Sequence, residues 1–151
     1  MVDVSLVLDA IVAVSIAAGA LFAVFELRDL KKDRRVQLML EATMHYTTRD
    51  FEDALCKLWR ADTSDPKELE KQVSYADLCM VADFHWAMAR LGDEGLIDRK
   101  VLMRLFAFSG VWNRIKPWIA AERAAAGLPE WYSSLEKLAE LQEREYPYFS
   151  T

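Results

Sequence analysis

The sequence predicts an all-α protein, in which an N-terminal transmembrane helix continues into a cytoplasmic antiparallel helical bundle. Three observations predict this fold class. Residues 4–25 form one apolar run, a cluster of basic residues follows it directly, and beyond residue 35 apolar residues recur at helical spacing without the alternation typical of strands. We therefore divide the chain into a transmembrane anchor (1–26), a basic juxtamembrane flank (27–35) and a helical bundle (36–151).

The apolar run reads VSLVLDAIVAVSIAAGALFAVF and contains 22 residues. A helix of this length measures about 33 Å, which is enough to cross the hydrocarbon core of a bilayer. A cleaved signal peptide is the alternative, but it requires a basic segment before the apolar core, and the chain starts with Met1-Val2-Asp3. The sequence therefore favours an anchor that is retained.

Charge next to the apolar run predicts its orientation. Five basic residues follow it, and none precedes it: Arg28, Lys31, Lys32, Arg34 and Arg35. The positive-inside rule places such a flank in the cytoplasm, at the surface of the membrane. We therefore expect a single-pass protein of the cell (inner) membrane, with its N-terminus outside and its C-terminal domain inside. The flank can also contact anionic lipid.

Two features of the predicted span suggest that it is more than an anchor. Ser15, Gly19 and Ala23 repeat every four residues and form a ridge of small side chains, against which another helix can pack closely. Asp9 places a carboxylate about 8 Å inside the outer boundary. A carboxylate in a membrane is costly and suggests a functional role, whereas one this close to the surface can also reach water or headgroups.

The bundle begins with the continuation of the anchor helix through the basic flank. A short helix follows, with Thr48 as its N-cap and an apolar face that includes Leu55 and Trp59. Asp65-Pro66 marks the start of the next helix. The segment YADLCMVADFHWAMARLG is apolar nearly all round, which predicts the buried central helix of the bundle.

Asp98 is expected to cap one long helix that ends at Gly127, and Pro117 inside it predicts a kink or a split. Pro129 is expected to open the last helix. The two cysteines, Cys56 and Cys79, fall on apolar faces and are expected to be buried free thiols.

No cofactor, metal or nucleic-acid site is expected. Residues 36–151 hold 14 basic and 19 acidic side chains, and this net charge of −5 disfavours a nucleic-acid partner. His45 and His85 lack the further ligands that zinc or iron sites need. Asp83 is an isolated carboxylate in an apolar helix. A buried acid can be catalytic, but more often an arginine, here Arg114 or Arg123, or the amides of a helix end satisfy it, and we favour this structural role. No nucleophile elbow or phosphate-binding loop occurs, so no catalytic residue is predicted.

The tryptophans divide into two groups. Trp59, Trp86 and Trp112 lie at core positions of their helices and are expected to pack inside. Trp118 and Trp131, each near a proline, are candidates for a patch that contacts a partner protein.

The chain resembles a prokaryotic family of single-span, N-terminally anchored helical proteins that is known as a domain of unknown function. The resemblance rests on the N-terminal span with its charged continuation, on FEDALCKLW, on the stretch from Tyr75 to Ile97 that ends in GLID, and on WNRIKPWIAAERAAAG followed by SLEKLAEL. It covers nearly the whole chain and implies the architecture, but no catalytic residues.

These features predict a non-enzymatic interaction module that is tethered to the membrane, such as an accessory subunit or adaptor of a membrane complex. Its expected partners are the lipid bilayer and either another membrane protein or a second copy of the chain, bound through the span. The first alternative is a homo-oligomeric membrane protein that acts in signalling or as an effector. The second is an enzyme that acts on a lipid or a small molecule.

Overall fold

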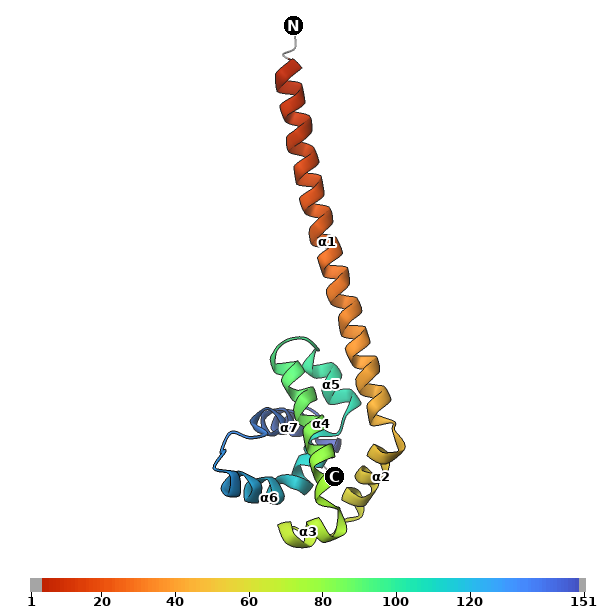
Figure 1. Cartoon of the computed structure of the whole chain (residues 1–151), viewed down its shortest axis with the longest axis vertical. Helices are drawn as coiled ribbons and strands as arrows, with labels where there is room; N and C mark the ends of the chain where they lie inside the picture. The colour runs from red at the N-terminus through yellow and green to blue at the C-terminus, as the bar shows by residue number, and fades with distance from the viewer. Residues whose placement is uncertain (1–3, 150–151) are drawn as a thin grey trace. The chain divides into compact units, whose positions relative to one another are not determined.

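The computed structural model describes residues 4–149, except for the side chains of residues 4–11, 29, 31, 32 and 149. Within residues 4–149 the chain is helical and contains no strand, which confirms the predicted fold class at the level of secondary structure. It forms two compact units, Met1–Leu40 and Glu41–Thr151. Helix α1 (Val4–Tyr46) runs without interruption from the first unit into the second, as predicted for the helix that passes through the basic flank (Figure 1).

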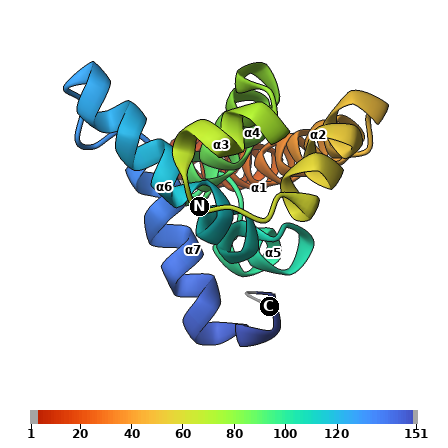
Figure 2. The same cartoon turned by 90° about the horizontal axis from the view of Figure 1, so that it is seen from below.

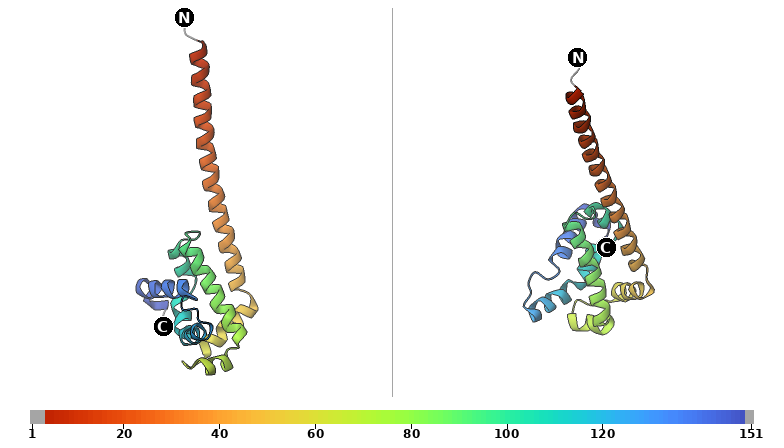
Figure 3. Two further views of the ribbon diagram at one scale, coloured as in Figure 1. Left: turned by 60° about the vertical axis from the view of Figure 1, so that its left-hand side comes forward. Right: turned by 45° about the horizontal axis from the view of Figure 1, so that its top comes forward.

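The second unit contains the remaining helices. They are α2 (Arg49–Arg60), α3 (Pro66–Gln72), α4 (Tyr75–Asp93), α5 (Arg99–Leu105), α6 (Phe108–Ala126), α7 (Ser133–Glu145) and the short 3₁₀ helix η1 (Pro147–Phe149). Helix α4 packs against α2, α5, α6 and α7, and Figures 1 and 3 show it between α2 on one side and α7 on the other. Its residues Leu78, Val81 and Ala82 are fully buried. The prediction that this segment is the central helix is therefore confirmed.

The last turn of α1 belongs to the core of the second unit. Ala42 is buried, and the ring of Tyr46 lies 5.1 Å from that of Phe106 and 5.2 Å from that of Phe51. Phe84 on α4 completes this group, with its ring 4.9 Å from that of Phe51. Aromatic pairs at such distances stabilise a core beyond the area that they bury.

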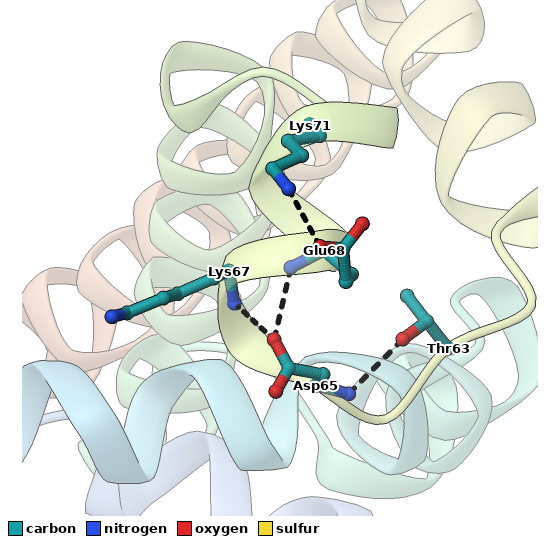
Figure 4. Close-up of polar contacts among 5 residues, drawn as sticks. All are labelled: Thr63, Asp65, Lys67, Glu68 and Lys71. Carbon is teal, nitrogen blue, oxygen red and sulfur yellow. Dashed lines mark hydrogen bonds and ion pairs between the residues drawn. The ribbon is translucent and has the colours of Figure 1, made fainter.

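All three predicted N-cap residues stand at the starts of their helices, and two of them cap the helix through the side chain. The carboxylate of Asp65 accepts hydrogen bonds from the backbone N–H groups of Lys67 and Glu68 at 2.9 and 3.0 Å, with Pro66 at the first helical position (Figure 4). Asp98 accepts one from Lys100 N at 2.8 Å. Thr48 is the N-cap residue of α2, but its hydroxyl donates to the carbonyl of His45 at 2.8 Å and accepts no hydrogen bond from the first turn of the helix.

The single helix predicted between Asp98 and Gly127 is wrong, because the chain breaks between α5 and α6. The carbonyl groups of Met103 and Phe106 at the end of α5 both accept hydrogen bonds from Nε2 of Gln142, at 2.6 and 2.7 Å. The N–H of Ser109 at the start of α6 donates to Oε1 of the same side chain at 2.7 Å. A buried carboxamide thus replaces the helical hydrogen bonds lost at the break. Pro117 does not divide α6, which remains one helix around it.

The turn after α6 also differs from the prediction. Gly127 ends α6 in the left-handed conformation, with φ at 67°, as expected for a glycine after a helix. The last helix, however, begins at Ser133 and not at Pro129. Tyr132 precedes it with φ at 61°, so the chain reverses direction over residues 128–132 before α7 packs against α6 (Figure 2).

Two predictions about side-chain burial are corrected. Cys56 is exposed and Cys79 is half-buried, because the buried face of α2 is formed by Phe51, Ala54, Leu55 and Leu58, and Cys56 lies off this face. Among the tryptophans expected in the core, Trp112 is buried, Trp86 is half-buried, and Trp59 is 38% exposed at the edge of the α2 face.

Candidate functional site

The apolar part of α1 whose side chains are described, residues 12–25, is exposed on all sides. Seven large apolar side chains between residues 12 and 25 are 53–69% exposed: Val12, Val14, Ile16, Leu21, Phe22, Val24 and Phe25. At about 100° of rotation per residue, these positions are distributed around the helix and do not form a single stripe. This segment therefore has no polar face, whereas the amphipathic helices that cover a globular core have one.

The predicted ridge of small residues lies along this segment. Ser15, Gly19 and Ala23 are all exposed, and a Cβ atom added at Gly19 would meet no atom within 4 Å. The ridge therefore offers a surface on which another helix can approach the α1 backbone closely. Asp9, which was predicted to accompany the ridge, belongs to the part of α1 whose side chains lie outside the description.

The basic flank continues α1 beyond the apolar segment. The side chains of Arg28, Arg34 and Arg35 are exposed, whereas those of Lys31 and Lys32 lie outside the described part. Among the residues that are described with their side chains, no helix combines the length and the apolar character needed to cross a membrane.

The predicted partner patch of Trp118 and Trp131 does not exist as a surface. Trp118 is 1% exposed, and its indole N–H donates to Glu70 on α3 at 2.9 Å. Trp131 is half-buried and stacks on the ring of Tyr132 at 5.0 Å. Neither placement was predicted from sequence.

Asp83 has a partner, but not the one that was predicted. The hydroxyl of Tyr132 donates to its Oδ1 at 2.7 Å. Burial raises the pKa of Tyr132 most, and the hydrogen bond to Asp83 raises it further. The hydroxyl therefore keeps its proton and remains a donor. The two predicted arginines bind elsewhere. Arg123 pairs with Glu136 at 2.9 Å, and Arg114 donates to the carbonyl of Ala61 at 2.8 Å.

His85 is fully buried and was missed as a structurally important residue. Its Nδ1 lies 2.7 Å from the carbonyl oxygen of Val81, one turn earlier in α4, and its Nε2 has no hydrogen-bond partner in the described part. Rings of Tyr46, Phe51 and Phe108 surround it at centroid distances of 5.5–6.2 Å. Burial among these apolar groups lowers the pKa of His85 to about 4. The imidazole is therefore neutral near pH 7.

The described residues contain no group of three or more histidine, cysteine, aspartate or glutamate side chains arranged to hold a metal ion. The ring of His85 has the rings of Tyr46, Phe51 and Phe108 as neighbours, whereas a metal site needs three or four convergent ligands.

Comparison with known proteins identifies a family but no relative of known function. No curated protein and no solved structure matches the chain. One family model, described as "Domain of unknown function (DUF4760)", matches residues 13–142, which include most of α1 and all of α2–α6 together with most of α7. Because this match covers well over half of the chain, the protein belongs to the DUF4760 family.

Proposed function

We propose that this protein is a membrane-tethered, non-enzymatic interaction module, an accessory subunit or adaptor of a membrane complex. Residues 4–25 serve as a single transmembrane span in the cell (inner) membrane, with the N-terminus outside and the helical bundle in the cytoplasm. The span binds a partner membrane protein as well as anchoring the chain. The observation that carries this proposal is the apolar surface of α1, exposed around its full circumference.

An apolar surface on all sides of a helix is favourable only when a surrounding apolar medium or several protein neighbours cover it. The seven large side chains between residues 12 and 25 have neither within the described chain. Lipid supplies such a medium, and the apolar run from Val4 to Phe25 has the length that a bilayer requires. The basic residues that follow this run supply the charge asymmetry that orients a span.

The adaptor role, as opposed to an enzymatic one, is supported by what the polar groups of the bundle do. Gln142 closes a helix break, Asp83 holds Tyr132, and Arg123 pairs with Glu136. Each of these contacts stabilises the packing of one helix on another. The three contacts lie at separate places and do not line one cleft. An arrangement of this kind favours a rigid scaffold that presents surfaces.

Membrane topology can be tested by cysteine labelling in intact cells. Cys56 and Cys79 are first replaced by serine and alanine, and single cysteines are then introduced as Asp3→Cys or Thr63→Cys. A membrane-impermeant maleimide is expected to label position 3 in intact cells and position 63 only after lysis. The opposite pattern, or release of the full chain from membranes by alkaline carbonate, would contradict the proposed anchor.

The adaptor role itself requires a partner. Purification of the full chain in a mild detergent, followed by mass spectrometry, is expected to yield another membrane protein in fixed stoichiometry. A chain that purifies only with copies of itself would overturn the adaptor role and favour the homo-oligomeric alternative. The ridge of Ser15, Gly19 and Ala23 suits either type of helix contact.

A further inference from the structure

A pocket of about 570 Å³ lies in the bundle between the end of α2, the linker to α3, and α6. Its size is in the range of sites that hold small molecules. The polar residues of its lining are Asp62, Thr63 and Ser64 from the linker, and Asn113 and Arg114 from α6. The pocket belongs entirely to the second unit, so its role does not depend on whether α1 crosses a membrane.

Arg114 is one of two arginines that the structure describes as half-buried, and the two have different surroundings. Arg123 has a carboxylate partner, Glu136, at 2.9 Å. Arg114 has none among the described residues, and its Nη1 donates to the carbonyl of Ala61 at 2.8 Å and, more weakly, to that of Leu58 at 3.5 Å. Its guanidinium also lies 5.2 Å from the ring centre of Trp59. These contacts fix the planar group, while its Nη2 and Nε have no hydrogen-bond partner and no carboxylate pairs with it among the described residues.

Asp62 supplies the opposite charge on the same pocket. Its backbone N–H donates to Oε1 of Gln72 at 3.4 Å, while no hydrogen bond or ion pair of its carboxylate is found within the described part of the chain. In particular, Asp62 and Arg114 do not pair with each other, although both line the pocket. The pocket is therefore lined by one cationic and one anionic group, neither of which has an ion-pair partner among the described residues.

The linker that carries Asp62 and Ser64 is held in place. The N–H of Asp65 donates to the hydroxyl of Thr63 at 3.1 Å, and the carboxylate of Asp65 caps α3 (Figure 4). On the opposite wall, Pro117 has no N–H, so the carbonyl of Asn113 loses its usual helical donor beside the pocket. A preorganised wall with spare donors and acceptors lowers the entropic cost of binding a small ligand.

We propose that this pocket binds a small zwitterion of the amino-acid class. The ligand carboxylate accepts from the free N–H groups of Arg114, and the ligand ammonium donates to Asp62 and to the carbonyl of Asn113. A simple anion such as phosphate pairs with Arg114 but is repelled by Asp62. A simple amine pairs with Asp62 but is repelled by Arg114. The pair of unpartnered opposite charges thus selects a molecule that carries both.

Isothermal titration calorimetry on the full chain in detergent tests this proposal. The probes are the proteinogenic L-amino acids, with propionate and ethylamine as analogues of alanine that keep one charge each, and inorganic phosphate. At least one amino acid is expected to bind, while propionate, ethylamine and phosphate do not. Asp62→Asn and Arg114→Gln should each weaken that binding by about tenfold or more, since each removes a charge-assisted contact.

Arg60→Gln is the matched control, because Arg60 is an exposed arginine of α2 that does not line the pocket. Its affinity for the amino acid should equal that of the unaltered chain. Asp62 is exposed and its replacement leaves the core intact, so this variant remains informative even if loss of Arg114 perturbs the fold. Failure of every amino acid to bind, tighter binding of phosphate, or undiminished affinity in Asp62→Asn would overturn the proposal.

Discussion

The backbone N–H of Ser109 donates to Oε1 of Gln142 at 2.7 Å, across 33 positions of sequence. The same carboxamide holds two carbonyl groups at the end of α5 through its Nε2. Gln142 is fully buried on α7, so one polar side chain fixes the end of α5, the start of α6 and the position of α7. Helix α7 therefore contributes the hydrogen bonds that the α5–α6 break would otherwise lack.

Replacement Gln142→Leu should destabilise the bundle by about 3 kcal/mol or more, because three buried backbone groups lose their partners at once. The midpoint of thermal or urea unfolding, followed by circular dichroism, measures the effect. Glu143→Leu, at the exposed neighbouring position, is the control and should change stability little. A Gln142→Leu variant as stable as this control would show that the break does not depend on the carboxamide.

Trp118 and Trp86 should differ in their importance for folding. Trp118→Ala removes a fully buried indole and its hydrogen bond to Glu70, and should cost about 3–5 kcal/mol. Trp86 is half-buried, and Trp86→Ala should cost less. Equal losses for the two variants, measured by the same unfolding assay, would contradict the placement of Trp118 in the core.

The buried His85 predicts a loss of stability in mild acid. Its pKa is lowered to about 4 in the folded chain from about 6.5 in the unfolded chain, so between these values the unfolded chain binds more protons. The contribution of His85 to the free energy of unfolding is therefore fully present above about pH 6.5. It falls by about 3 kcal/mol as the pH is lowered from about 6.5 to about 4. Unfolding midpoints between pH 4 and 7 measure this dependence.

His85→Phe should remove much of this pH dependence, because it replaces the titrating ring with one that suits the aromatic surroundings. If His85→Phe keeps the full slope of the unaltered chain, other groups cause it.

The second unit should fold without the preceding part of α1. A fragment of residues 41–151 retains Ala42 and Tyr46, and we expect it to be helical and to unfold cooperatively. A fragment of residues 47–151 lacks both side chains and should be less stable by about 2 kcal/mol or more. Equal stability of the two fragments would show that the last turn of α1 contributes nothing to the core.

Helix positions were predictable where the signal is local. Asp65-Pro66, Asp98 and Gly127 each act on their own neighbours in the chain, and the structure places all three as expected. The break before α6 was not predictable in this way, because the group that stabilises it lies 33 positions away on α7. The left-handed backbone conformation of Tyr132 was not predictable either, because residues other than glycine rarely adopt this conformation.

The same distinction applies to the candidate sites. The ridge on α1 follows from the spacing of three residues and needs no tertiary information. The partner of Asp83 depends on the turn before α7, so the arginines chosen from sequence were wrong and Tyr132 was missed. The pocket beside Arg114 was also missed, because the linker and α6 that form it are about 50 positions apart and only the packed bundle brings them together.

The last prediction concerns the ridge on α1, the surface on which the proposed adaptor role depends. Close approach of two helices in lipid relies on van der Waals contact, so a large side chain at the centre of the ridge should prevent it. Gly19→Ile should therefore reduce crosslinking or co-purification with the partner, while membrane insertion and the fold of residues 41–151 stay unchanged. Asp9→Asn should have a smaller effect, because the amide still forms hydrogen bonds.

The control is Ala17→Ile, which adds a side chain of the same size about 160° around the helix from Gly19. It should leave association intact if the ridge is the contact. A span in which every residue is leucine tests the alternative, since it preserves the anchor and removes the ridge. If that span supports the same complex, α1 acts only as a tether, and the partner must bind the bundle.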